Sequence, residues 1–147
     1  MVAKNPINDF SQSWLFEPLM DDPTFFAKKM FGGLAVYFWG KLVFLLTEDE
    51  SDFTWKGKTF PFAIWNGILI PTDRSLHESL EAEFSDLVTH PVLGKWLYLH
   101  LSAPNYETTA KALVTAILRR DTRLGKFPKM NSKTQSKSGK KLLSKKN

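Results

Sequence analysis

The fold class is decided by the stretch LAVYFWGKLVFLLT, residues 34–47. Aromatic and aliphatic residues form two runs, 34–38 and 41–47, and Trp39-Gly40 is short enough to connect them as a hairpin. Both runs are apolar at odd and even positions, which is typical of strands that are covered on two sides, or covered once and facing a partner. The stretch therefore predicts a β-hairpin in the middle of a sheet.

Two helices are predicted ahead of this hairpin. Residues 10–15 place their apolar side chains on one helical face, and Pro18 should end that helix. The second helix is predicted to begin at Asp22, an N-cap residue, with Pro23 at its first helical position. Gly32-Gly33 is expected to end it, because glycine readily adopts the left-handed conformation of a helix C-terminus.

Further strands and two more helices are predicted after the hairpin. The strands are residues 53–55, 59–60, 63–65, 68–70 and 96–101, and the helices begin at Asp73 and near residues 102–105. Asn66-Gly67 is expected to be a turn, since this dipeptide is a strong hairpin signal. Short turns between strands indicate an antiparallel sheet. We therefore predict a single α+β domain with helices at both ends and one helix between strands.

The charge is unevenly distributed along the chain. Residues 1–120 hold eleven basic and fourteen acidic side chains, a net charge of −3, whereas residues 121–147 hold nine basic and one acidic, a net charge of +8. Past Pro128 the only apolar residues are Met130, Leu142 and Leu143, which are too few to offset the entropy cost of ordering the segment. The domain is therefore predicted at residues 1–122, and residues 123–147 are predicted to be a disordered, lysine-rich tail.

Composition excludes several classes of protein. The 147 residues include no cysteine, which excludes disulfides, thiolate catalysis and cysteine-ligated metals. No run approaches the roughly 18 apolar residues of a membrane span, and residues 1–9 lack the apolar core of a secretory signal. A cytoplasmic protein without membrane contact is expected.

The sequence carries no motif typical of a catalytic, metal-binding or cofactor-binding site. Its histidines, His77, His90 and His100, are too far apart in sequence to share a helical turn. We predict that His77 is solvated, that His90 lies at a helix end and that His100 lies in a strand. We therefore expect a protein that is not an enzyme and that binds neither cofactor nor metal.

The lysine-rich tail is the clearest functional signal. Cations on such a segment can neutralise phosphates without reading base sequence. The candidate nucleic-acid-binding residues are Arg119, Arg120, Arg123, Lys126, Lys129, Lys133, Lys137, Lys140, Lys141, Lys145 and Lys146. A purely solubilising extension is the alternative interpretation of the tail.

Aromatic residues cluster around Lys56 and Lys58, within residues 53–65. Aromatic strands usually belong to a core, and this is the interpretation that we favour. The alternative is a platform on which the bases of single-stranded nucleic acid stack while lysines contact phosphates.

The central hairpin and the residues before it also carry a family resemblance. It rests on Lys29, Met30, Phe31, Gly32, Gly33, Tyr37, Gly40, Lys41 and Phe44. These positions resemble the opening of the TfoX/Sxy N-terminal domain, and Gly94-Lys95-Trp96 is similar to the related MmcQ/YjbR proteins. The resemblance implies a compact α+β domain with an antiparallel sheet and a DNA-binding or competence-related regulatory role, with no agreed set of catalytic residues.

These observations favour a non-enzymatic, bacterial-type domain that contacts nucleic acid non-specifically through its tail, or acts in transcription-related regulation. Two alternatives stay open. The aromatic sheet is also compatible with a protein–protein adaptor, and a small-molecule pocket beneath that sheet is compatible with a ligand-binding domain.

Overall fold

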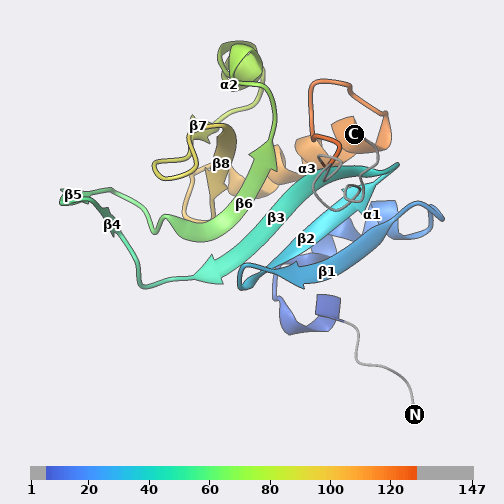
Figure 1. The fold of residues 1–147 in the computed structure, drawn as a ribbon, viewed down its shortest axis with the longest axis horizontal. Coiled ribbons are helices and arrows are strands. Elements are labelled where there is room, and N and C mark those ends of the chain that lie inside the picture. The colour runs from blue at the N-terminus through green and yellow to red at the C-terminus, as the bar shows by residue number, and fades with distance from the viewer. Residues whose placement is uncertain (1–5, 129–147) are drawn as a thin grey trace, which may run out of the picture.

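The hairpin predicted at residues 34–47 lies inside a six-stranded antiparallel sheet (Figure 1). The computed structural model describes residues 6–128. The sheet has the order β1-β2-β3-β6-β8-β7. Its strands are β1 (Phe26–Met30), β2 (Gly33–Phe38), β3 (Lys41–Asp49), β6 (Trp65–Pro71), β7 (Val88–Thr89) and β8 (Trp96–His100).

A second, two-stranded sheet projects from the domain (Figure 1). It consists of β4 (Thr54–Trp55) and β5 (Lys58–Thr59), which pair with each other rather than with the main sheet. This hairpin matches the prediction of strands on either side of Lys56-Gly57. We refer to residues 50–64, which connect β3 to β6 and contain this hairpin, as the arm.

Three two-residue turns of the same type join neighbouring strands. In each turn a residue with positive φ is followed by a glycine with positive φ, the geometry of a type I′ turn, whose twist matches that of the flanking strands. The turns are Phe31-Gly32 (φ 54° and 77°), Trp39-Gly40 (53° and 81°) and Lys56-Gly57 (50° and 81°).

The second predicted helix is wrong, because residues 26–30 form the edge strand β1. Phe26 pairs with Tyr37 of β2, and the two strands meet at the Phe31-Gly32 turn. Asp22 caps a turn instead of a helix: its carboxylate accepts hydrogen bonds from the backbone N–H and the hydroxyl of Thr24, at 2.8 and 2.7 Å. Pairing with β2 therefore outweighs the helix-start and helix-stop residues of this segment.

The turn predicted at Asn66-Gly67 is also wrong, because β6 runs without a break from Trp65 to Pro71. Gly67 lies against β8, and a Cβ at this position would sit 2.2 Å from the carbonyl oxygen of Leu99. A glycine is required here by the close approach of two backbones and not by a turn.

Within residues 6–128, three helices complete the domain, α1 (Glu17–Met20), α2 (His77–Glu83) and α3 (Tyr106–Leu118). Pro18 does not end a helix but lies in the first turn of α1, and the residues before it form the short 3₁₀ turns Pro6–Asp9 and Ser13–Phe16. The last helix matches the prediction: its inward-facing apolar side chains are buried from Tyr106 to Ile117, whereas Leu118 at its end is exposed.

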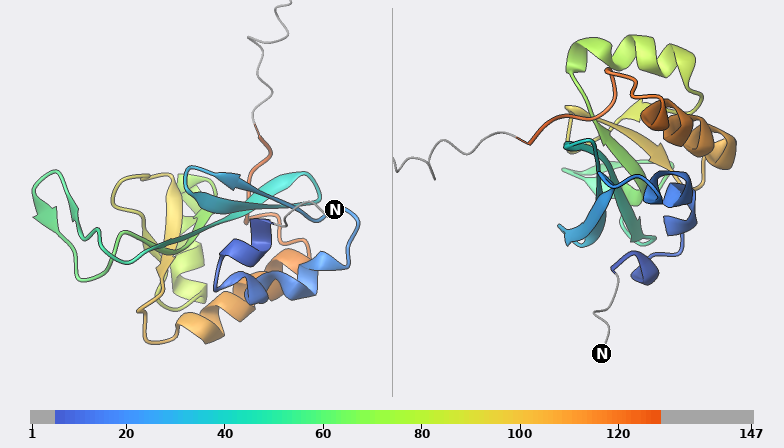
Figure 2. Two further views of the ribbon diagram at one scale, coloured as in Figure 1. Left: turned by 90° about the horizontal axis from the view of Figure 1, so that it is seen from below. Right: turned by 90° about the vertical axis from the view of Figure 1, so that its right-hand side faces the viewer.

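One face of the sheet carries the helices and the main core (Figure 2). Fully buried side chains of this core include Phe16, Phe44, Ile68 and Leu80. No helix among residues 6–128 covers the other face, which we call the open face (Figure 2). It carries a smaller cluster of Ala35, Leu45, Leu69 and Tyr98. The structure is thus the α+β domain predicted from the sequence, with helices at both ends and one between strands.

Candidate nucleic-acid interface

A cation lies on an aromatic ring at the turn between β2 and β3. The guanidinium carbon of Arg120, just after α3, is 3.9 Å from the ring centroid of Trp39. Trp39 is 46% exposed because the type I′ turn holds it outside the sheet. Stacking of this kind holds the guanidinium in a fixed position on the ring.

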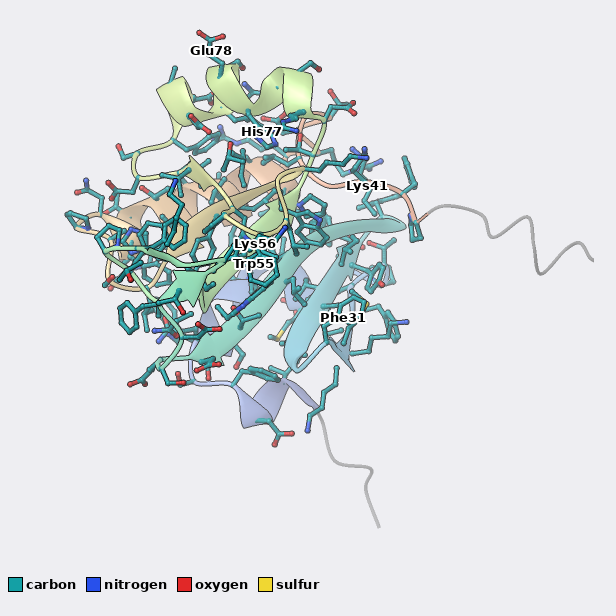
Figure 3. All side chains as sticks on the ribbon, turned by 60° about the vertical axis from the view of Figure 1, so that its left-hand side comes forward. Phe31, Lys41, Trp55, Lys56, His77 and Glu78 are labelled. Atoms are coloured by element: carbon teal, nitrogen blue, oxygen red, sulfur yellow. The ribbon has the colours of Figure 1, made fainter. Side chains whose placement is uncertain are left out.

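A second cation–aromatic pair lies beside the first. The ammonium group of Lys41 is 5.6 Å from the ring centroid of Phe127, and Phe127 is 66% exposed. Lys41 also donates hydrogen bonds to the carbonyl oxygens of Thr122 and Leu124, at 3.2 and 3.3 Å. The residues that follow α3 are therefore held against the first residue of β3, which Figure 3 labels close to the end of the described chain.

Trp39, Lys41, Arg120 and Phe127 line one hollow of about 320 Å³, and we call these four residues the cation–aromatic patch. The hollow lies within the size range of small-molecule sites. On the adjacent part of the open face, the rings of Phe26 and Tyr37 are 5.7 Å apart and the ammonium group of Lys28 is 5.7 Å from the ring of Tyr37. Exposed rings and cations therefore alternate across the ends of β1, β2 and β3.

The predicted start of the tail at Arg123 does not agree with the structure. Leu124 is fully buried, and Leu42 and Lys126 exchange two backbone hydrogen bonds of 2.9 and 3.0 Å. The N–H of Gly125 donates to the carbonyl oxygen of Pro71 at 2.9 Å. Residues 123–126 are thus inserted between the ends of β3 and β6, and the fold extends beyond residue 122.

The predicted binding residues divide into three groups. Arg119 and Arg120 are exposed at the end of α3. Arg123 and Lys126 already have acidic partners: the Arg123 guanidinium is 2.7 Å from Asp121 and 2.8 Å from Glu83, and the Lys126 ammonium is 3.4 Å from Asp73. The remaining residues, Lys129, Lys133, Lys137, Lys140, Lys141, Lys145 and Lys146, lie outside the described residues.

The ion pairs of Arg123 assign it a structural role. Hydrogen bonds to Asp121 and Glu83 raise the pKa of Arg123, and the hydrogen bond from Arg123 lowers the pKa of Asp121. Because Arg123 joins α2 to the segment after α3, it is an anchor for the fold at this end. Arg120 and Lys41 are the cations that the patch presents.

Two of the three histidines differ from their predictions. His77 is buried and not solvated: it points inward from α2 while Glu78 points outward (Figure 3), and its ring nitrogens contact Thr89 at 3.0 Å and the Lys95 carbonyl at 3.3 Å. His90 lies beyond β7 and not at a helix end, and it is almost fully buried. His100 ends β8 as predicted, with its ring stacked on Phe62 at 4.4 Å.

The aromatic cluster of residues 53–65 is divided by the structure. Phe62 and Trp65 pack against the open-face cluster, in line with the core interpretation. Phe53 and Trp55 are exposed on the arm, where the ammonium group of Lys56 lies 5.7 Å from the Trp55 ring. The sequence analysis did not identify Trp39, Lys41 and Phe127 as site residues. Each of them lies next to a turn glycine or a lysine, but a search for apolar periodicity takes no account of such neighbours.

Comparison of the chain with protein-family models, with curated proteins and with solved structures found no match. The resemblance of residues 29–46 to the TfoX/Sxy N-terminal domain therefore stays a prediction. Within residues 6–128, no helix has the length and apolar character to cross a bilayer, and no three metal-ligating side chains converge.

Proposed function

We propose that the chain is a non-enzymatic protein that contacts single-stranded nucleic acid through the cation–aromatic patch and the lysine-rich segment beyond it. One observation carries the proposal: the Arg120–Trp39 and Lys41–Phe127 pairs line the same hollow, at the point where the chain continues into seven lysines. The resemblance to TfoX/Sxy domains is consistent with a transcription-related setting for this contact, which is part of the proposal.

The chemistry of the patch suits unpaired bases. An exposed ring can stack on any base, and such stacking contributes about 1–3 kcal/mol per base without selecting sequence. Arg119, Arg120 and the lysines after residue 128 supply positive charge for the phosphates on either side. Paired bases are already stacked in a duplex, so single strands are expected to bind more tightly than duplexes of equal length.

The test is binding of fluorescent single-stranded and duplex oligonucleotides by the full chain, measured by anisotropy over a series of salt concentrations. Replacing Trp39 by Ala should weaken single-strand binding roughly 5- to 150-fold, from the loss of one stacking platform. Trp14→Ala is the matched control, because Trp14 is also exposed and also carries a cation, Lys111 at 5.6 Å, but lies beside α3. Equal losses in the two variants, or no binding of any DNA or RNA at low salt, would overturn the proposal.

The contribution of the lysines is measured separately by the salt dependence. For single strands the logarithm of the binding constant falls with the logarithm of salt concentration by about 0.7 for each phosphate neutralised. A chain ended after Pro128 lacks seven lysines, and its slope should flatten by about 0.7 for each lysine that contacts a phosphate. An unchanged slope would limit the contact to the patch and remove the tail from the proposal.

The arm supports a second candidate, contact with a protein partner. Phe53 and Trp55 are exposed on a hairpin that projects away from the sheet (Figure 1), and aromatic residues are enriched at protein interfaces. A partner recovered by the full chain and by the chain ended after Pro128, but lost when Trp55 is replaced by Ala, would favour this candidate over the first.

A further inference from the structure

An apolar groove lies at the other end of β3 from the cation–aromatic patch. Its volume is about 740 Å³, and its lining residues include Phe31, Leu45, Trp65 and Leu93. Leu45 and Trp65 belong to or pack against the open-face cluster. Phe31 is 86% exposed, because the type I′ turn between β1 and β2 holds it outside the sheet.

Carboxylates gather at the rim of this groove. Glu48, Asp49, Glu50 and Asp52 fall within five residues, and Glu48 and Asp49 line the groove directly. In the described part of the chain no ion pair joins any of these four to a cation. Among residues 6–128, the donors to Glu48 and Asp49 are neutral, such as the N–H of Gln12, 2.9 Å from Glu48, and the hydroxyl of Ser51, 2.7 Å from Asp49.

One segment of this chain has the complementary chemistry. Leu142-Leu143 is preceded by Lys140-Lys141 and followed, after one serine, by Lys145-Lys146. The two leucines are an apolar pair for the groove, and the two lysine pairs match the carboxylates of its rim. We propose that residues 140–146 dock in this groove of their own chain, with Leu142-Leu143 against Trp65 and Leu93 and with the lysines against Asp49, Glu50 and Asp52.

The chain is long enough to reach the groove. The described chain leaves the domain on the open-face side, opposite the helices (Figure 2). Lys126 pairs with Leu42 at the start of β3, and Asp49 ends that strand, so the distance along the strand between them is about 23 Å at roughly 3.3 Å per residue. The fourteen residues from Lys129 to Leu142 can extend to about 46 Å.

Docking within one chain is also favoured by effective concentration. A coil of fourteen residues has a root-mean-square end-to-end distance of about 20 Å, close to the span it must cover. Effective concentrations are highest when these two lengths match, and reach the millimolar range for short linkers. Even a weak contact between two leucines, four lysines and the groove would therefore be populated.

Docking has a consequence that goes beyond nucleic-acid contact. Lysines held at the carboxylate rim are withdrawn from phosphates, so the groove competes with polyanions for the same four cations. The acidic rim thus takes the place of nucleic acid as the partner of these lysines. It weakens nucleic-acid binding by the chain until a polyanion displaces residues 140–146 from the groove. The docking itself is measured without nucleic acid, so it stands or falls separately from the proposed function.

The test uses the absence of cysteine and the presence of five tryptophans in the chain. A nitroxide label is attached to the cysteine of the full chain carrying Ser144→Cys, and the indole N–H signals of the tryptophans are recorded by NMR. The variant Trp65→Phe identifies which of these signals belongs to Trp65. We expect loss of the Trp65 signal and retention of the Trp14 signal, because Trp14 lies on the helix side of the sheet. Reduction of the nitroxide should restore Trp65.

Two variants separate the parts of the proposal. Replacing Leu142 and Leu143 by Asp in the labelled chain should restore the Trp65 signal, and so should Glu50→Lys with Asp52→Lys. Equal signal at Trp65 and Trp14 in the unsubstituted labelled chain, or a Trp65 loss that both variants retain, would overturn docking. Loss of the Trp65 signal from isotope-labelled protein without nitroxide, on mixing with nitroxide-labelled protein, would assign the segment to a second copy and would also overturn it.

Discussion

The hydroxyl of Tyr98 donates a hydrogen bond of 2.6 Å to the carbonyl oxygen of Ala63. The same hydroxyl accepts one of 2.6 Å from the N–H of Asn66. Tyr98 is fully buried in β8, so these bonds fasten the base of the arm to the middle of the open face. His90 makes a further contact to the arm, between its Nε2 and the carbonyl oxygen of Ile64 at 2.6 Å.

Replacing Tyr98 by Phe should lower the free energy of unfolding by about 1–3 kcal/mol, because it leaves a buried carbonyl oxygen and a backbone N–H without partners. Tyr106→Phe is the matched control. The Tyr106 hydroxyl is buried without a hydrogen-bond partner among the described residues, so its removal should be neutral or stabilising. Urea unfolding measures both, and equal losses would contradict the assigned contacts.

The stability of the domain should fall as the pH drops below about 6.5, through His90. Its Nδ1 accepts hydrogen bonds from the N–H groups of Val92 and Leu93, at 3.0 and 3.1 Å, so Nε2 carries the proton and donates to Ile64 at 2.6 Å. Burial lowers the pKa of His90 below its ordinary value, although the Ile64 hydrogen bond opposes the shift. The folded state therefore requires a neutral ring.

The sign follows from proton binding. Below pH 6.5 the unfolded chain binds a proton at His90 that the folded chain excludes, so the free energy of unfolding falls by up to about 1.4 kcal/mol per pH unit until the folded-state pKa is reached. Above this window the full stability is present. Urea unfolding at a series of pH values should show this slope, and His90→Gln should reduce it; the same slope in both proteins would contradict the assignment.

Replacing Gly67 by Ala should destabilise the sheet by about 1–3 kcal/mol. The added Cβ would meet the Leu99 carbonyl oxygen at 2.2 Å, and neither backbone can move without breaking the pairing of β6 with β8. Gly94→Ala is the control, because its Cβ would lie 3.8 Å from the Arg74 side chain, an ordinary contact. Thermal unfolding distinguishes them, and a stable Gly67→Ala protein would show that β6 and β8 lie further apart.

The end of the folded region can be tested by two truncations. A chain ended after Pro128 should keep its stability, whereas a chain ended after Thr122 should lose several kcal/mol. The shorter chain lacks the Leu124 side chain, whose burial contributes about 1.5–3 kcal/mol, together with the ion pairs of Arg123 and the two hydrogen bonds of Lys126. Equal unfolding midpoints would place the boundary at residue 122 after all.

Local punctuation misled the prediction at the two places where long-range pairing competes with it. Asp22, Pro23 and Gly32-Gly33 have the spacing of a helix, but Phe26 to Met30 find complete pairing with β2. Asn66-Gly67 has the composition of a turn, whereas the real turns have Phe31, Trp39 and Lys56 before their glycines. Positive φ is unfavourable for residues other than glycine, but the strand pairing on both sides of each turn outweighs this local cost.

Much of the candidate interface was beyond sequence reasoning for a related physical reason. The lysine-rich tail and the arginines at the end of α3 could be identified from the sequence, because charged residues can be counted without knowing what they contact. The Arg120–Trp39 stack joins residues 81 positions apart in the chain, and Lys126 meets Leu42 across a similar separation. Neither contact has a local signature.

By itself, the sequence determined the α+β class, the central hairpin, the last helix and the contrast between an acidic body and a basic C-terminal region. These properties depend on apolar periodicity and on composition, which act over a few neighbouring residues. Only the tertiary structure decided that residues 26–30 are a strand, that residues 123–126 belong to the fold, and that exposed rings and cations from distant segments meet at one end of β3. Those outcomes depend on which distant segments of the backbone pair with each other. The energy of such pairing depends on both segments, so the sequence of one segment alone does not determine it.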